Sequence, residues 1–229
     1  MRILIVAATH RDVKKLRDRI QLIHQHRPYL SGHRYGNLLV DVLVTGSGGI
    51  FMAYHLTKVL ESGSYDLAIN IGIAGSFDYF LEQGFVVNVV QDQFADLGIE
   101  EKGEFYTLGE KEMMDENSYP FTDEILRSLG NFEIEEIESL IPVKAVTVNT
   151  LHGSKESIQR VKEKFNPEIE TMDGAAFFYV CLSEKVPFLQ IRAISNFVEI
   201  RKVENWNIPL AIDNLTDTII AIFDELKID

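Results

Sequence analysis

Glycine-rich turns and small polar groups gather at four points of the sequence where chemistry could take place. They are Gly46-Ser47-Gly48-Gly49, Gly72-Ile73-Ala74-Gly75-Ser76, the block Glu170–Ala176 and the pair Ser195-Asn196. Backbone N–H groups at a glycine turn can bind an anion, a hydroxyl group or a water molecule, and small side chains let a planar ligand approach the backbone. Within the third segment, Asp173 could accept hydrogen bonds from a ribose diol while Met172 packs on the face of the sugar.

Three of these segments also have a purely structural interpretation. The turn at residues 46–49 lacks the third glycine of a dinucleotide-binding fingerprint and the Lys-Ser/Thr pair of a phosphate-binding loop, so it could simply be a tight turn that needs positive φ. Asp173 could cap the helix that follows it. Ser195-Asn196 could end a strand in an asparagine turn. The types of these residues therefore leave both interpretations open.

The elements that must position these residues alternate along the chain. Strands are expected at residues 2–8, 38–45, 67–72, 86–90, 143–148 and 187–194, and helices at about 12–24, 49–61, 155–164, 174–184 and 207–226. Such alternation predicts an α/β fold with a mainly parallel sheet. The segment 92–119 has weak periodicity and is expected to be a long loop, of the length that is usually functional or disordered.

The polar residues come directly after the predicted strands. This holds for Thr9–Asp12, Gly46–Gly49, Gly72–Phe77, Asn149–Gly153 and Ser195-Asn196. In open α/β sheets, ligands bind at the carboxyl ends of the strands. The sequence therefore predicts one site that is assembled from several segments far apart in the chain.

Composition restricts the partners and the compartment. The chain has 229 residues, of which 46% are hydrophobic and 25% charged, and its formal net charge is −13. A negative field of that size repels phosphate backbones and anionic lipids, so nucleic acid and membrane surfaces are not expected partners. No signal peptide is visible, and no apolar run reaches the roughly 20 residues needed to cross a bilayer. We expect a cytoplasmic protein.

The cysteine and the histidines do not predict a disulfide or a metal site. Cys181 stands alone, which excludes an internal disulfide and fits a reducing compartment. The six histidines are scattered, and His24 and His26 would point in different directions on the predicted first helix. No metal and no cofactor is expected.

Taken together, these segments resemble the purine nucleosidase and nucleoside phosphorylase superfamily over nearly the whole chain. The resemblance rests on Asn70–Ser76, Glu170–Ala176 and Arg192–Asn196. Within this superfamily the chain is most similar to the futalosine hydrolases, through the segments 94–98, 147–153 and 204–211. The resemblance implies a single α/β domain over residues 1–229, with a mixed central β-sheet between two layers of helices.

The resemblance also implies an activity, the hydrolysis of the N-glycosidic bond of a purine nucleoside. The residues it implicates in catalysis are Asp12, Asp173 and Asn196. Those it implicates in binding are Gly48, Ala74, Gly75, Thr150, Leu151, Met172, Ser195 and Arg201. The base would lie over the turn at 72–76, the ribose beside Asp173, and the nucleophilic water near Asp12. Members of the superfamily are usually homodimers or larger homo-oligomers.

Asn196 and Arg201 suggest which nucleoside is the substrate. Related adenosine-type nucleosidases carry an aspartate where this chain has Asn196. An amide can donate to a 6-oxo group and accept from a protonated N7, which favours a 6-oxopurine over methylthioadenosine. Futalosine carries a benzoate group beyond its ribose, and Arg201 could bind that carboxylate or remain a solvated side chain beside Glu199.

Two alternatives to hydrolysis remain open. Phosphorolysis needs cationic groups around the phosphate, and Arg11 is the candidate cation after the first strand. The second alternative is nucleoside binding with little catalysis, because Asp12 and Asp173 stand where the superfamily normally has glutamate. Each side chain is one methylene shorter, and a misplacement of about 1 Å can cost on the order of a hundredfold in rate. His10 could then replace Asp12 as the base, or it could be a surface histidine.

Overall fold

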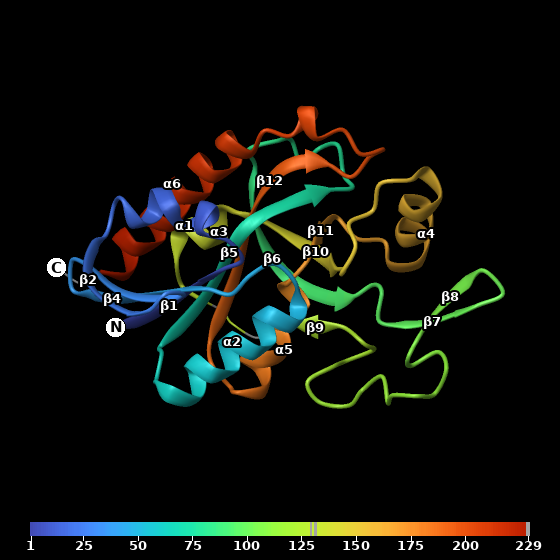
Figure 1. The fold of residues 1–229 in the computed structure, drawn as a ribbon, viewed down its shortest axis with the longest axis horizontal. Coiled ribbons are helices and arrows are strands. Elements are labelled where there is room, and N and C mark those ends of the chain that lie inside the picture. The colour runs from blue at the N-terminus through green and yellow to red at the C-terminus, as the bar shows by residue number, and fades with distance from the viewer. Residues whose placement is uncertain (129, 131, 228–229) are drawn as a thin grey trace.

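The computed structural model describes every residue of the chain except 129, 131, 228 and 229. Its centre is one ten-stranded, twisted sheet (Figure 1). Four strands run parallel in the middle of it: β4 (Leu38–Val44), β1 (Arg2–Ala7), β5 (Leu67–Ser76) and β12 (Phe188–Phe197), in that order. These strands are almost wholly buried, which explains why their sequences are apolar at nearly every position.

Helices cover both faces of the sheet. α1 (His10–Arg17), α3 (Glu135–Ser139) and α6 (Ile208–Leu226) lie on one face, and α2 (Gly49–Ser62) and α5 (Gly174–Ser183) lie on the other (Figure 1). Because side chains alternate along a strand, β1 contributes to both cores: Ile3 and Ile5 to the α1/α6 side, Leu4 and Val6 to the α2/α5 side. The structure thus confirms the three-layer α/β fold.

Beyond β12 the sheet becomes mixed. β6 (Val86–Phe94) is antiparallel to β12, whereas β10 (Ile141–Thr147) is parallel to β6. The short β11 (Ile169–Thr171) runs parallel to β10 and antiparallel to the end of β5, and β9 (Leu126–Arg127) pairs with β6. α4 (Lys155–Phe165) packs near the carboxyl ends of β5 and β10, and the 3₁₀-helix η1 (Val203–Asn205) precedes α6.

The prediction of a first helix over residues 12–24 was wrong at its carboxyl end. The helix α1 stops at Arg17, and the chain forms the antiparallel strands β2 (Gln21–Arg27) and β3 (Leu30–Tyr35) at the edge of the sheet. Every residue of β2 is exposed, so the strand has no apolar alternation to reveal it. His24 and His26 therefore share one face of a strand, with ring centroids 3.7 Å apart, rather than pointing apart on a helix.

The predicted loop over residues 92–119 was only partly correct. Strand β6 continues to Phe94, and residues 98–107 form a hairpin of β7 (Gly98–Glu101) and β8 (Glu104–Thr107). This hairpin extends away from the sheet at the right of Figure 1. Its two strands alternate poorly because one side of the pair has no core to cover. Among the described residues, no helix has the length and apolar character needed to cross a membrane.

Candidate active site

A pocket opens at the carboxyl ends of β1, β5 and β12, beside the first residues of α5. Most of the residues singled out in the sequence line it: Asp12, Ala74, Gly75, Leu151, Met172, Asp173, Ser195, Asn196 and Arg201. Gly48 and Thr150 do not line it, although their neighbours Ser47 and Leu151 do. The fold therefore brings segments from the two ends of the chain to one place, as parallel strands with helical crossovers must.

Asp12 stands in the first turn of α1, where the backbone N–H of Thr9 (2.9 Å) and the Thr9 hydroxyl (2.7 Å) both donate to its Oδ2. Its other oxygen, Oδ1, takes no part in these bonds. The carboxyl group is buried, and loss of water raises its pKa, against the lowering effects of the Thr9 hydrogen bonds and of Arg11 and Arg192. Asp12 is thus a more basic carboxylate than an exposed aspartate.

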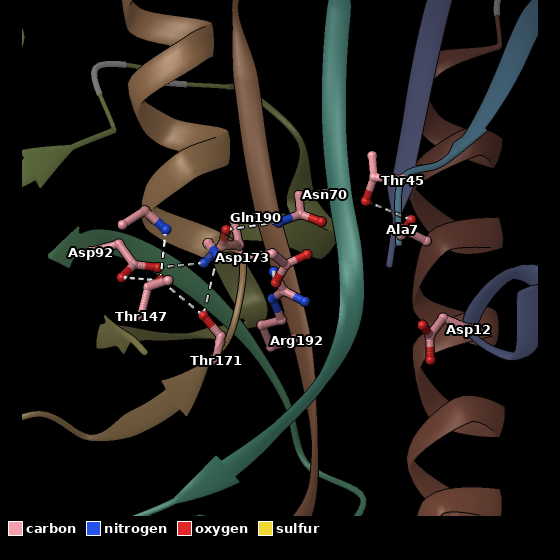
Figure 2. Close-up of polar contacts among 12 residues, drawn as sticks. Ala7, Asp12, Thr45, Asn70, Asp92, Thr147, Thr171, Asp173, Gln190 and Arg192 are labelled. Atoms are coloured by element: carbon pink, nitrogen blue, oxygen red, sulfur yellow. Dashed lines mark hydrogen bonds and ion pairs between the residues drawn. The ribbon is translucent and has the colours of Figure 1, made fainter. Parts of the chain in front are cut away.

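Arg192 and Asp173 form a buried ion pair in the wall of the pocket (Figure 2). Arg192 Nη2 donates to Asp173 Oδ1 at 2.8 Å, and both side chains are nearly inaccessible to water. The guanidinium lies against Gly72, where an added Cβ would come within 2.5 Å of Nη1. Gly72 therefore makes room for Arg192, a reason for this glycine that the sequence pattern did not reveal.

The remaining oxygen of Asp173, Oδ2, is buried and has no hydrogen-bond partner among the described residues. Asp173 does occupy the N-cap position of α5, but its side chain makes no capping hydrogen bond. A buried carboxylate oxygen without a donor is costly, and such an atom on a pocket wall is suited to accept from a ligand hydroxyl group.

Behind Asp173 a chain of buried polar side chains crosses the sheet (Figure 2). Asn70 donates to Gln190 Oε1 (3.0 Å), and Gln190 donates to Asp92 Oδ2 (3.0 Å). Thr147 donates to the second oxygen of Asp92 (2.9 Å). Complete burial raises the pKa of Asp92 to about 7, although both hydrogen bonds and Arg192 act to lower it.

The same network fixes the beginning of α5. The hydroxyl of Thr147 accepts from the backbone N–H of Ala175 (2.7 Å) and lies 3.1 Å from the hydroxyl of Thr171, which accepts from Gly174 N (3.3 Å). The first N–H groups of a helix have no partner within the helix, and here two hydroxyls supply one. Asp173 is positioned by this anchored turn.

A β-bulge aims Ser195 and Asn196 into the pocket. Ile194 pairs with Ala74 and Asn196 with Gly75, so Ser195 is the extra residue of β12. The Ser195 hydroxyl lies within hydrogen-bond distance of Asn196 Oδ1 (2.7 Å) and of Ala74 O (3.2 Å), and Asn196 Nδ2 donates to Phe197 O (2.9 Å). Since an amide has two N–H groups and two acceptor lone pairs, Asn196 keeps one of each for a ligand.

Glu170 and His152 also line the pocket, and sequence reasoning did not assign them a role. Glu170 Oε1 accepts from the backbone N–H of His152 (3.2 Å), and Oε2 is hydrogen-bonded to His152 Nδ1. The loop that carries His152 is held at its other end by Asp96, which accepts from Asn149 N (2.5 Å) and Nδ2 (3.1 Å). Glu170 is the middle residue of β11, whose three residues are all buried, and no local sequence pattern marks it as a residue of the site.

Charged and aromatic residues between β12 and α6 line the mouth of the pocket, and Glu199 is the anionic one. Arg201 and Lys202 line it together with Trp206, and the Arg201 guanidinium lies 5.2 Å from the centroid of the Trp206 ring. Only Arg201 was predicted from the sequence. Lys202 and Trp206 belong to an irregular segment before α6, where no periodic pattern identifies a residue that faces a site.

Comparison with known proteins places these features in a family. The model of the family described as "Phosphorylase superfamily" matches residues 2–225. The 5'-methylthioadenosine/S-adenosylhomocysteine nucleosidase of Bacillus cereus is 26% identical, over 99% of this chain and 100% of that protein. The protein of the same name from Bacillus anthracis has the same identity and coverage.

Two solved structures share the fold over almost their full length. The nucleosidase of S. pneumoniae in complex with a transition-state inhibitor has a TM-score of 0.82 at 20% identity, and the alignment covers 99% of this chain and 100% of that one. The futalosine hydrolase of Helicobacter pylori has a TM-score of 0.80 at 14% identity, with 98% of each chain covered. At these identities the likeness concerns the fold.

Proposed function

Since the chain belongs to the phosphorylase superfamily, we propose that it hydrolyses the N-glycosidic bond of a purine nucleoside. The observation that carries this proposal is the meeting of Asp12, Asp173 and Asn196, from three separate strand ends, in one pocket. Its relatives at 26% identity over their whole length are named as nucleosidases. A few polar groups that converge in one largely apolar pocket are what a small-molecule site such as a nucleoside site requires.

Asp173 and Asp12 have different roles in the proposed reaction at the sugar. In the proposed reaction the C1'–N9 bond breaks, its electron pair passes to the base, and the ribosyl group becomes a cation. Asp173 Oδ2 accepts a hydrogen bond from a ribose hydroxyl and orients the sugar. Asp12 Oδ1 holds a water molecule and takes its proton as the water oxygen bonds to C1', and this proton afterwards leaves to solvent.

Asn196 receives the leaving base. The base takes up a proton from solvent at N7 as the C1'–N9 bond breaks. The remaining N–H group of Asn196 donates to O6, and its remaining lone pair accepts from N7–H. This pattern fits hypoxanthine or guanine. A 6-aminopurine would present an N–H group where Asn196 offers an N–H group, so one hydrogen bond would be lost. We therefore propose a 6-oxopurine nucleoside as substrate.

The mouth of the pocket supports an anionic, aromatic group beyond the ribose. Arg201 and Lys202 supply two positive charges to the pocket lining that holds Trp206, against one negative charge from Glu199, on a chain whose net charge is −13. A guanidinium binds a carboxylate through paired hydrogen bonds, and the indole can stack on an aromatic ring. The benzoate group of futalosine combines both features, so futalosine is the substrate that we propose.

Water fits the site as nucleophile better than phosphate does. Asp12 faces the side of attack, and its negative charge would repel a phosphate ion. The Arg192 guanidinium is buried in its pair with Asp173, and Arg11 is the cation of the pocket lining that is next to Asp12 in the chain, whereas Arg201 and Lys202 belong to the segment before α6. Phosphorylases surround the anion with several cationic groups.

Incubation with three nucleosides tests the proposed substrate. We expect hypoxanthine to be released fastest from futalosine, more slowly from inosine, and adenine most slowly from methylthioadenosine, as followed by chromatography of the free base. Arg201→Ala should raise KM for futalosine at least tenfold and leave KM for inosine unchanged. An unchanged KM for futalosine would refute the role of Arg201, and fastest release of adenine would refute the 6-oxopurine assignment.

A further inference from the structure

Asp92 is a completely buried acid that takes no part in the chemistry described above. It lies on β6, behind the wall of the pocket, and is not among the residues that line it. Its Oδ2 accepts from Gln190 Nε2 (3.0 Å) and its Oδ1 accepts from the Thr147 hydroxyl (2.9 Å). A buried charge is costly, and a neutral side chain of the same shape would fill the same space at a lower cost.

The hydrogen bond to Asp92 sets the direction of the two hydroxyl groups beside it. A hydroxyl group has one hydrogen to donate and two lone pairs with which to accept. Thr147 donates its hydrogen to Asp92 and uses one lone pair for Ala175 N (2.7 Å). In its contact with Thr171 (3.1 Å) it can therefore only accept. Thr171 is the donor of that pair, and its own oxygen accepts from Gly174 N (3.3 Å).

The direction of this pair concerns Asp173, because Thr171 and Gly174 lie on either side of it in the chain. Gly174 also packs directly on the acid, since an added Cβ there would come within 2.2 Å of Asp92 Oδ2. Gln190 already donates to Oδ2, so a proton taken up by Asp92 would sit on Oδ1 and face Thr147. Thr147 would then have to donate to Thr171, whose hydrogen would lose its acceptor.

We propose that ionised Asp92 is a positioning residue for the sugar, which fixes the direction of the Thr147–Thr171 pair and so holds Asp173 where its free oxygen meets a ribose hydroxyl. Protonation reverses the pair, Thr171 turns to find another acceptor, and the turn that carries Asp173 loosens. The base is then bound as before and the ribose less firmly. This inference rests on the proposed function and extends it to a residue that does not touch the substrate.

The charge of Asp92 changes within the neutral range of pH. Burial raises its pKa to about 7, although the hydrogen bonds from Gln190 and Thr147 act to lower it. Of the charged groups that act on it, Arg192 on β12 lowers the pKa and Asp173 at the start of α5 raises it. Above about pH 7 the carboxylate is ionised, and below it the carboxyl group is protonated. Binding of the ribose should therefore weaken as the pH falls through this value.

Binding of formycin B and of hypoxanthine tests the proposal, because only the first carries a ribose. Formycin B is an inosine analogue whose glycosidic bond joins two carbon atoms and is not hydrolysed, so calorimetry can follow its binding. We expect its Kd for the wild type to rise about five- to tenfold between pH 8 and pH 6, a part of what one hydrogen bond to a charged group contributes. The Kd of hypoxanthine should change by less than about twofold over the same range.

Asp92→Asn should bind formycin B at pH 8 as weakly as the wild type binds it at pH 6, with a Kd that no longer depends on pH. The substitution removes a buried charge, so the melting temperature should not fall, which separates positioning from support of the fold. Asp66→Asn is the matched control. Asp66 precedes β5 at the end away from the pocket, where it accepts from Arg2 N (2.6 Å), so this variant should bind formycin B as the wild type does.

The outcomes distinguish failure of this inference from failure of the proposed function. If the wild type shows the dependence on pH and Asp92→Asn abolishes it, but inosine is not cleaved, the proposed hydrolysis fails and the inference stands. If the wild type cleaves inosine and Asp92→Asn binds formycin B at pH 8 within about twofold of the wild type, the inference is overturned and the hydrolysis stands.

Discussion

At the scale of single residues, Asp12 serves both the fold and the proposed chemistry. Its Oδ2 accepts two hydrogen bonds from Thr9 and so closes the first turn of α1, while Oδ1 is left for a water molecule. The superfamily resemblance implies glutamate at this position. The shorter aspartate is secured by the turn that carries it, which leaves the carboxylate little freedom to be misplaced.

Thr9→Val should move the acidic limb of the pH profile. The Thr9 hydroxyl lowers the pKa of Asp12, and burial raises it, so removal of the hydroxyl leaves the raising effect less opposed. The base acts in its deprotonated form. We therefore expect kcat/KM to be lost at a higher pH in Thr9→Val than in the wild type. Asp12→Asn should lose on the order of a hundredfold or more in kcat. If the acidic limb of the pH profile does not move in Thr9→Val, a group other than Asp12 controls it.

Asn196→Asp should shift the preference toward 6-aminopurines. An aspartate can accept from a 6-amino group, and in its protonated form it can donate to N7, whereas it cannot donate to O6 while it is ionised. The ratio of kcat/KM for adenosine over inosine should rise at least tenfold, as measured by release of the free base. Unchanged base selectivity would defeat the argument about the leaving group.

At the scale of elements, a neighbouring side chain explains why β5 has a glycine at position 72. Gly72→Ala would place a methyl group within 2.5 Å of Arg192 Nη1, and Arg192 cannot move away without breaking its bond to Asp173. We expect a loss of about 1–3 kcal/mol in the free energy of unfolding, from denaturant titration, together with a large loss of turnover.

Gly63→Ala is the control for this substitution. Gly63 follows α2 in an extended conformation, and an added Cβ would make only ordinary contacts, the nearest at 3.5 Å. Stability and turnover should both stay close to those of the wild type. Full activity in Gly72→Ala would show that the Arg192–Asp173 pair is not needed in its observed geometry.

Asp92, on β6 beside the start of α5, should make the free energy of unfolding depend on pH. The pKa of Asp92 is about 7 in the folded protein, against an ordinary value of 3.8. Between these values the folded state binds more protons than the unfolded state, so the free energy of unfolding falls as pH rises from about 4 to about 7. Asp92→Asn should remove this fall, because the amide can donate to Thr147, which can then donate to Thr171.

Thermal unfolding at two pH values measures this effect. Each kcal/mol moves the melting temperature of a domain of this size by about 2–4 °C. We expect Asp92→Asn to melt several degrees above the wild type at pH 8 and close to it at pH 4. A variant that melts lower than the wild type at pH 8 would show that the Asp92 charge is needed for folding.

The sequence predicted the elements of the parallel core because strands such as β1 and β12 are apolar on both faces and lie between clear helices. It failed at β2, which is exposed at every position, and at β7 and β8, whose pairing depends on a turn and not on a core. For the site, strand ends pointed to Asp12 and Asn196, and the Glu170–Ala176 block with the family resemblance pointed to Asp173. Glu170, His152 and Arg192 escaped because their roles come from contacts between strands, which no local pattern records.

At the scale of the whole molecule, an apolar stripe borders the pocket. Ile50, Phe51 and Tyr54 on α2 are 78%, 55% and 59% exposed, directly after the turn that carries Ser47. α5 packs beside α2 and adds the half-exposed Tyr179. Contiguous exposed apolar side chains commonly mark an interface between proteins. We propose that this face joins two copies of the chain in a homodimer.

Ile50→Glu should therefore weaken self-association. Sedimentation velocity should show a dimer for the wild type and a monomer, at the same protein concentration, for the variant, because a buried unpaired charge disfavours the interface. Phe80→Glu is the control, since Phe80 is 88% exposed but lies outside α2 and α5. A monomeric wild type, or an Ile50→Glu variant that remains a dimer, would contradict the assignment of this face.

The measurement that tests hydrolysis most directly is the release of hypoxanthine from futalosine in buffer free of phosphate. We predict a rate that is unchanged when phosphate is added, a sugar product without phosphate, and no release by Asp173→Ala. Release that requires phosphate and yields a sugar phosphate would contradict the account and identify a phosphorylase.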